Sequence, residues 1–471
     1  MAARPLKAYL AVFGGMFVHL TLGTFYTFGN LTPYVTSYLR NSTSDHDMDY
    51  SDSVWIFATA AVGQGLSMFL GGIISRRLGL RLTVLLGAGL MSSGVTFTYF
   101  TIQHSYIGVI LTYGLMVGLG AGVAYSLPLS CAMKWFPERK GMAGGLVVAG
   151  FGGGAFIFNL VQTAFINPGN LSPDLKVNGE KYFTQPELLD RVPWVFVLTG
   201  GVYVVMQIVG VAAMREPLSP EFTTEKEPTV DFALGSDSEE QTTNKTTTEG
   251  VSDSTNSSDH VQDSSESDLS RQADDLSPLQ VLRNRAFYTI WLCFLLNGQG
   301  VVLLSSLYKD YGQTFIDNDV FLAVTGAFAA VFNFSGRMFW GFIADRFSFK
   351  IAMLCLCTSF CSLMITFNAT RLGGKPLFFI YVCLLYGTLA GNFALFSVAV
   401  AKSFGQTHYA INYGLAFTSQ VVTAPLGAIF ASQLKTQIGW FGLFSMITGF
   451  TFLSLLLTTT FNVKNKKGKD I

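Results

Sequence analysis

The sequence predicts an all-α membrane protein with twelve transmembrane helices in two six-helix halves. Half of the 471 residues are hydrophobic and only 13% are charged, which is typical of a chain that crosses a membrane many times. Twelve apolar runs are long enough to span a bilayer, and a polar segment divides them into two groups of six. A short sequence pattern also recurs 269 residues later, at the equivalent place in the second group.

Each apolar run holds roughly the 20 residues that a helix needs to cross the hydrocarbon core, and the longer runs can tilt. The runs lie at about 8–37, 53–75, 82–102, 106–134, 141–166, 193–214, 286–308, 320–343, 350–370, 377–401, 409–434 and 440–461.

The polar segment 216–284 is rich in Ser, Thr, Asp and Glu and poor in aromatic residues. Sixteen of the 30 acids lie between Glu216 and Asp275, so the rest of the chain is basic, with 14 acids and 27 bases. A segment of this composition cannot bury a core and is expected to be a disordered loop. The predicted organisation is therefore an N-terminal half (1–215), this acidic loop (216–284), a C-terminal half (285–463) and a basic tail (464–471).

Lysine and arginine are unevenly distributed between the two ends of the predicted spans. If the N-terminus is in the cytoplasm, most of these cations lie at the cytoplasmic ends of the spans. They are Arg4, Lys7, Arg76, Arg77, Arg81, Arg139, Lys140, Arg346, Lys350 and the tail lysines. The outer loops hold fewer cations, so both termini and the acidic loop are expected in the cytoplasm of a multi-pass protein of the plasma membrane. The sequons at Asn41 and Asn170 then face outside as candidate glycosylation sites.

The internal repeat predicts how the two halves are related. GIISRRLGLR at 72–81 follows the second run, and GFIADRFSFK at 341–350 follows the eighth. WFPERKG at 135–141 and SFGQTHY at 403–409 form a second, weaker pair. Parallel six-helix halves related by an axis along the membrane normal are the architecture of the major facilitator fold.

The repeated loop also predicts a gate at the cytoplasmic end. The carboxylate of Asp345 can accept hydrogen bonds from the N-terminal amides of a neighbouring helix. Arg76, Arg77, Arg139 and Arg346 can help to hold this end closed. Because Arg76 stands where the second copy has Asp345, the two halves are expected to close differently.

Arg337 is the one permanent charge that lies well inside a predicted span. An arginine at the middle of a spanning helix costs about 2.5–3.5 kcal/mol, and no Asp or Glu lies at comparable depth to neutralise it. One interpretation is that it reaches the headgroups or bonds backbone carbonyls. The other, which we favour, is that it lines a cavity and binds an anion, a carboxylate above all, through its planar fork.

His19 is the other ionisable group at depth, near the middle of the first run. It is either a neutral histidine bonded to a neighbouring helix or a proton carrier, because the ordinary pKa of histidine is near neutrality.

Three blocks of sequence resemble the oxalate:formate antiporter branch of the major facilitators and, more distantly, the animal monocarboxylate transporters. They are KWFP with RKGMAGG at 134–145, FNFSGRMFWGFIADRFS at 332–348, and FG with NYG at 404–405 and 412–414. The resemblance covers nearly all of the predicted transmembrane body and excludes 216–284.

The resemblance implies that Arg337 binds the carboxylate of the substrate. In the oxalate carriers a lysine supplies a second cation, and Gln420 stands at the matching position. In the monocarboxylate transporters a carboxylate accompanies the arginine, and Asn333 stands there. One cation with an uncharged hydrogen-bonding partner suits a single carboxylate, with or without a hydroxyl or keto group.

The resemblance also implies aromatic residues around the site. Tyr26 and Tyr125 match aromatic positions that line the cavity of the oxalate carriers, and Phe393 replaces a tyrosine. The alternative for all three is ordinary packing, because the chain contains 42 Phe and 18 Tyr.

The predicted function is secondary active or facilitative transport of small organic anions by alternating access, with monocarboxylates such as formate, lactate or pyruvate favoured. The alternatives are a dicarboxylate exchanger and a sensor of the same fold that does not transport. An enzyme is disfavoured because no Ser/His/Asp set, HExxH motif or phosphate loop is found at membrane depth. A proton or a counter-anion is the expected co-substrate. No cofactor, metal or nucleic acid is predicted, and an accessory protein is left open.

Overall fold

The computed structural model describes residues 6–42, 48–177, 180–217, 275–316 and 318–463. Most of the predicted acidic loop and the basic tail 464–471 lie outside the described residues, so the predictions made for them stay predictions. The described end of the acidic segment, from Asp275, contains the short helix α10 (Pro278–Leu282). A capping box formed by Ser277 and Gln280 stabilises the start of α10.

The helices before residue 217 make six passes through the bundle. They are α1 (Leu6–Leu22), η1 (Gly23–Thr27), α2 (Phe28–Ser42), α3 (Tyr50–Thr101), α4 (Tyr106–Val109), the π-helix η2 (Ile110–Met116), α5 (Val117–Trp135), η3 (Pro137–Arg139), α6 (Lys140–Ile166), α7 (Pro186–Leu189) and α8 (Val192–Ala213). The strands β1 (Leu175–Val177) and β2 (Glu180–Tyr182) form an antiparallel pair between the fifth and sixth passes.

The helices after residue 284 make six more passes. They are α11 (Arg285–Gln313), α12 (Asp319–Arg346), α13 (Phe349–Thr366), η4 (Phe367–Ala369), α14 (Thr370–Ser403), α15 (Tyr409–Phe417), α16 (Ser419–Ile429), the π-helix η5 (Phe430–Leu434) and α17 (Lys435–Thr460).

Within the described residues, eight helical segments are long and apolar enough to cross a membrane. Two of them, Asp52–Thr101 with 50 residues and Phe349–Ser403 with 55, are long enough for two passes each. The first turns back at Gly79, whose φ of 75° is outside the helical region, and the second turns near Gly374, with φ of 59°. Together with α12 and the pass formed by α15 and α16, the described chain crosses the bundle twelve times. The predicted fold class is confirmed.

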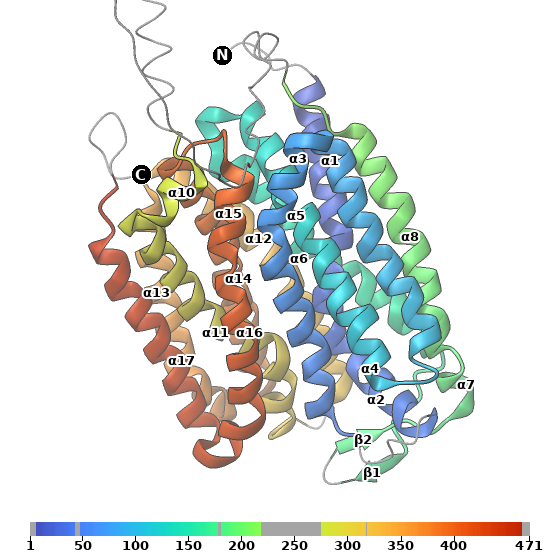
Figure 1. Ribbon diagram of the computed structural model, residues 1–471. Coiled ribbons are helices and arrows are strands. Elements are labelled where there is room, and N and C mark those ends of the chain that lie inside the picture. Colours follow the sequence, from blue (N-terminus) through green and yellow to red (C-terminus); the bar gives the residue numbers. More distant parts are fainter. Residues whose placement is uncertain (1–5, 43–47, 178–179, 218–274, 317, 464–471) are drawn as a thin grey trace, which may run out of the picture. The chain divides into compact units, whose positions relative to one another are not determined.

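The bundle has two ends with different chemistry (Figure 1). We call one the basic end, where α1 begins, α17 ends and α10 lies. The other is the hairpin end, which carries β1, β2, α2 and α7. The basic end holds Arg76, Arg77, Arg81, Arg139, Lys140, Arg346, Lys350 and Lys402.

The two halves meet along two seams. Helix α6 packs against α12, and α3 packs against α15 and α16. At the basic end of the first seam, Gly141 and Gly341 face each other, and a Cβ added to either would collide with the carbonyl oxygen of the other. Glycine is needed at both positions because the two backbones approach closely there. One hydrophobic core extends through both halves and includes Tyr125, Phe151 and Phe393.

Candidate functional site

Arg337 is completely buried on α12. Its Nε donates a hydrogen bond to Oδ1 of Asn333, at 2.9 Å, and its Nη1 donates to the backbone carbonyl of Val148 on α6, at 3.2 Å. Its Nη2 has no hydrogen-bond partner among the described residues. The bond to Val148 agrees with the interpretation that Arg337 bonds backbone carbonyls. Nη2 of the guanidinium, however, is left without an acceptor among the described residues.

The surroundings of the guanidinium are aromatic rather than acidic. The Cζ atom of Arg337 lies 4.7 Å from the ring centroid of Phe393 and 5.5 Å from that of Phe151. The faces of these rings attract a cation, but they do not neutralise it. No ion pair to Arg337 is formed by the carboxylates in the described part of the chain, whose paired cations include Lys134 and Lys402.

The local sequence explains how Arg337 is held. Asn333 precedes it by four residues, so both side chains lie on the same face of α12. Opposite them stands Gly152, in the glycine-rich part of α6. A Cβ at that position would lie 2.5 Å from Oδ1 of Asn333 and 3.3 Å from Nε of Arg337. The missing side chain at Gly152 thus makes room for the pair.

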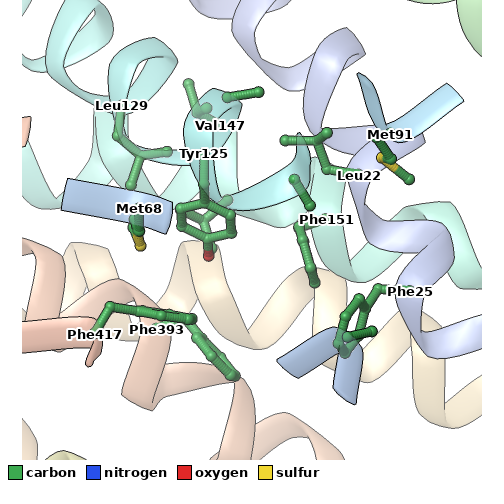
Figure 2. Close-up of a cluster of buried hydrophobic side chains, with 14 of the residues drawn as sticks. Leu22, Phe25, Met68, Met91, Tyr125, Leu129, Val147, Phe151, Phe393 and Phe417 are labelled. Carbon is green, nitrogen blue, oxygen red and sulfur yellow. The ribbon is translucent and has the colours of Figure 1, made fainter. Parts of the chain in front are cut away.

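Aromatic side chains from both halves surround this point (Figure 2). Tyr125 and Phe151 come from the first half, with ring centroids 5.3 Å apart, and they face Phe393 and Phe417 from the second. Tyr125 is buried, and its hydroxyl has no hydrogen-bond partner within the described ranges. The half-buried Tyr26 lies 5.5 Å from Phe151 between ring centroids. Both tyrosine hydroxyls are within interaction range of the guanidinium of Arg337.

His19 belongs to the same cluster. It is fully buried, its ring lies 4.9 Å from that of Tyr125, and it is within electrostatic reach of Arg337. Its Nδ1 lies 3.0 Å from the carbonyl oxygen of Gly15. Because a carbonyl only accepts, Nδ1 carries the proton, and Nε2 has a lone pair without a partner among the residues described.

Gln420 lies at the start of α16 and is 9% exposed. It follows Phe417 by three residues, and the ring of Phe417 is 5.7 Å from that of Tyr125. The amide Nε2 of Gln420 is 3.5 Å from the hydroxyl of Ser419 and lies beside Gly298 of α11. The described contacts do not join Gln420 to Arg337, so its role in substrate binding stays a prediction.

At the basic end, Asp345 ties α12 to the beginning of α6. Its carboxylate accepts hydrogen bonds from the amides of Gly141, at 3.0 Å, and Met142, at 2.8 Å, and it pairs with Lys402 of α14 at 3.2 Å. The negative charge also suits the positive end of the dipole of α6. These bonds hold the two halves together on the basic side of Arg337.

The other predicted gate residues lie at the same end. Arg76 bonds Nδ1 of His408, across the second seam between the halves. Arg77, Arg139 and Arg346 are exposed, and their part in a gate stays a prediction. At the opposite end, Asn41 lies in the last turn of α2 and Asn170 in the loop after α6; both are exposed.

Sequence reasoning missed two partners in this arrangement. Lys402 lies near the end of a predicted span, and its proximity to Asp345 on another helix cannot be read from the sequence. Phe151 lies in the stretch AGFGGGAF, which predicts close helix packing, and nothing in that pattern singles out its ring.

The profile of the Major Facilitator Superfamily matches residues 12–424. The chain belongs to this superfamily and is an integral membrane protein. It is 32% identical to "Apicoplast pyruvate carrier 1" of Toxoplasma gondii, over 94% of this chain and 86% of the relative. It is 22% identical to the "Oxalate:formate antiporter" of Oxalobacter formigenes, over 86% of this chain and 80% of the relative. The predicted resemblance to the oxalate:formate antiporter branch is confirmed.

A solved structure shows the same fold at low sequence identity. The proton:xylose symporter XylE superposes with a TM-score of 0.66 over 96% of this chain and 94% of its own, at 12% identity.

The Asp345 contacts lead to a prediction about closure of the basic end. In Asp345→Asn, the amides of Gly141 and Met142 lose a charged acceptor, and the attraction to Lys402 disappears. Hydrogen exchange followed by mass spectrometry should show faster exchange in peptides that cover 140–146. The control is Asp190→Asn, which changes an exposed acid at the hairpin end. Equal exchange rates of the 140–146 peptides in the two variants would mean that Asp345 does not hold the basic end closed.

Proposed function

We propose that this protein transports small organic anions by alternating access and that monocarboxylates are its preferred substrates. The observation that carries the proposal is the guanidinium of Arg337, which is fully buried, has an unpartnered Nη2 and lacks a carboxylate partner in the described part of the chain. A buried charge of this kind is costly unless something pairs with it.

A bound carboxylate supplies what the site lacks. It brings one negative charge and two acceptor oxygens, which can take hydrogen bonds from the guanidinium and from the hydroxyls of Tyr125 and Tyr26. A neutral solute would leave the charge of Arg337 uncompensated. The name of the pyruvate carrier supports a monocarboxylate as the substrate. The name of the oxalate:formate antiporter supports a small organic acid as the substrate in general.

The number of cations favours one carboxylate over two. The described polar residues near Arg337 include Asn333, His19 and three tyrosines, Tyr26, Tyr125 and Tyr413, none of which is a cation like Lys or Arg. The candidate position for a second cation holds Gln420. A dicarboxylate would keep one charge unpaired in a buried site. Exchange of dicarboxylates is therefore the second candidate function, and a sensor that binds without transporting is the third.

The contacts between the two halves support alternating access. Asp345, Gly141 and Gly341 join them on the basic side of Arg337. With the excess of Lys and Arg at the basic end facing the cytoplasm, both termini are cytoplasmic and the site is closed on that side. Rocking of one half against the other must break the Asp345 contacts before substrate can leave there.

A proton is proposed to travel with the substrate, and His19 is its candidate carrier. A second proton on His19 would be repelled by Arg337, which lies within electrostatic reach. A bound carboxylate neutralises that guanidinium and so makes protonation of Nε2 easier. Binding of the anion and of the proton would then support each other.

The central test is transport by Arg337→Lys. Lysine keeps the positive charge but loses the planar fork and the bonds to Asn333 and Val148, so uptake should fall at least tenfold while expression stays near that of the wild type. The measurement is uptake of radiolabelled formate, acetate, lactate, pyruvate and oxalate into proteoliposomes, with and without a pH gradient and with and without acid inside.

Each result of that panel separates the candidate functions. Uptake of monocarboxylates above oxalate supports the proposal, and the reverse order supports a dicarboxylate exchanger. Binding without flux identifies a sensor. Near-normal uptake by Arg337→Lys would assign Arg337 a purely structural role. The control is Arg283→Lys, which makes the same exchange at an exposed position after α10, outside the site and the proposed gate.

A second variant tests the proton. His19→Gln keeps a hydrogen-bonding side chain of similar size but cannot be protonated, so uphill uptake driven by a pH gradient should disappear. Exchange of labelled acid against unlabelled acid should persist at the wild-type level. If accumulation still follows the pH gradient in this variant, the proton moves by another route.

The membrane in which the protein works is proposed to be the plasma membrane. The relative from Toxoplasma gondii bears the name of an organelle, the apicoplast, so an organelle membrane is the alternative. Fluorescence microscopy of the tagged protein against markers of both membranes decides between them.

A further inference from the structure

Gln64 lies on a face of α3 that points toward the centre of the bundle. Phe57, Ala61, Gln64 and Met68 are spaced at i, i+4, i+7 and i+11, so they form one stripe along the helix. At one end of the stripe, the ring of Phe57 lies 6.4 Å from that of Tyr26. At the other end, Met68 belongs to the same buried cluster as Tyr125 (Figure 2). Gln64 stands between these two neighbours of the candidate site.

Two other faces of α3 pack against neighbouring helices. Gly63 and Gly71 pack against the backbone of α5, while Gly65 packs against Val421 and Gly72 against Ile411 of the second half. Gln64 borders the α5 face, because its backbone packs against Gly122, three residues before Tyr125 on α5. The amide of Gln64 is therefore held among the helices that enclose Arg337, away from lipid.

The amide of Gln64 is buried and incompletely bonded. The residue is 4% exposed, and its Nε2 has no acceptor among the described residues. Buried amides normally find partners, because leaving one unpaired costs about 1–3 kcal/mol. Gln207, which is also buried in the first half, illustrates the usual case, since it bonds both Ser92 and Thr21.

Three unpartnered buried donors lie on helices that enclose the candidate site. They are Nη2 of Arg337, the hydroxyl of Tyr125 and Nε2 of Gln64, and they come from three different helices. The first two suit a carboxylate, as argued above. The third is an uncharged donor from α3, which suits an uncharged acceptor on the same substrate.

We propose that Gln64 donates a hydrogen bond to the oxygen on carbon 2 of a 2-oxo monocarboxylate whose carboxylate is held by Arg337. This inference rests on the proposed function and names the substrate class more closely. A keto oxygen only accepts hydrogen bonds, and the amide nitrogen of Gln64 can donate one. Acids without this oxygen, such as acetate or propionate, leave the amide unpaired in a buried site, so the site selects against them.

The test compares pyruvate with propionate, which has the same carbon skeleton without the keto oxygen. Wild-type protein in proteoliposomes should take up pyruvate with a KM roughly three- to tenfold lower than that for propionate, the range expected for one hydrogen bond. Gln64→Met keeps the length of the side chain and removes the donor. In this variant the KM for pyruvate should rise to that for propionate, and uptake of propionate should be unchanged.

The control is Gln207→Met, which removes a buried glutamine that is fully bonded inside the first half. It should lower thermal stability without changing the ratio of the two KM values. If Gln64→Met fails to fold, Gln64→Leu makes the same deletion, and equal KM values in the wild type would still overturn the inference.

Two outcomes overturn the inference. One is equal affinity of the wild type for pyruvate and propionate. The other is a folded Gln64→Met or Gln64→Leu that keeps the wild-type preference. Failure of the proposed function looks different, because then the wild type takes up neither acid, or Arg337→Lys takes up both normally.

Discussion

The buried guanidinium of Arg337 is the constraint on which the rest of the site depends. A charge that cannot be removed by deprotonation lies at the centre of a bundle without an acidic partner among the described residues. Asn333, the carbonyl of Val148 and the rings of Phe151 and Phe393 hold it in place, and they satisfy it only in part. A carboxylate can supply the missing part, which is why we propose that this site binds an anion.

The proposed substrate site and the proposed gate share one pair of helices. Arg337 and Asp345 are eight residues apart on α12, or about 12 Å along the helix, and both contact α6. A small movement of α6 along α12 therefore affects the bond from Nη1 to Val148 and the bonds to Gly141 and Met142 together. Because cores repack between discrete arrangements rather than deforming smoothly, this seam is suited to couple binding with opening.

The twelve passes, the parallel halves and the position of Asn333 beside Arg337 could be predicted from the sequence, because each depends on local spacing or on an internal repeat. The sequence was also enough to raise Tyr26, Tyr125 and His19 as candidates, through resemblance or depth. Phe151, Lys402 and Gln64 were not found. A neutral amide or a ring in an apolar run has no signal of its own, and its importance comes from which helices pack around it. Whether Gln420 faces the substrate is likewise a matter of helix rotation that spacing does not determine.

The most direct test of the central claim compares an acid with its neutral amide. Purified protein is heated in detergent with rising concentrations of pyruvate or of pyruvamide, at constant ionic strength, and the unfolding temperature is recorded. A ligand that binds only the folded protein stabilises it by about 2.7 kcal/mol at 100 times its Kd. If Arg337 is a carboxylate site, pyruvate raises the unfolding temperature in a saturable way and pyruvamide does not. An equal rise with both compounds, or no rise with pyruvate or with any other acid of the uptake panel, would contradict the account.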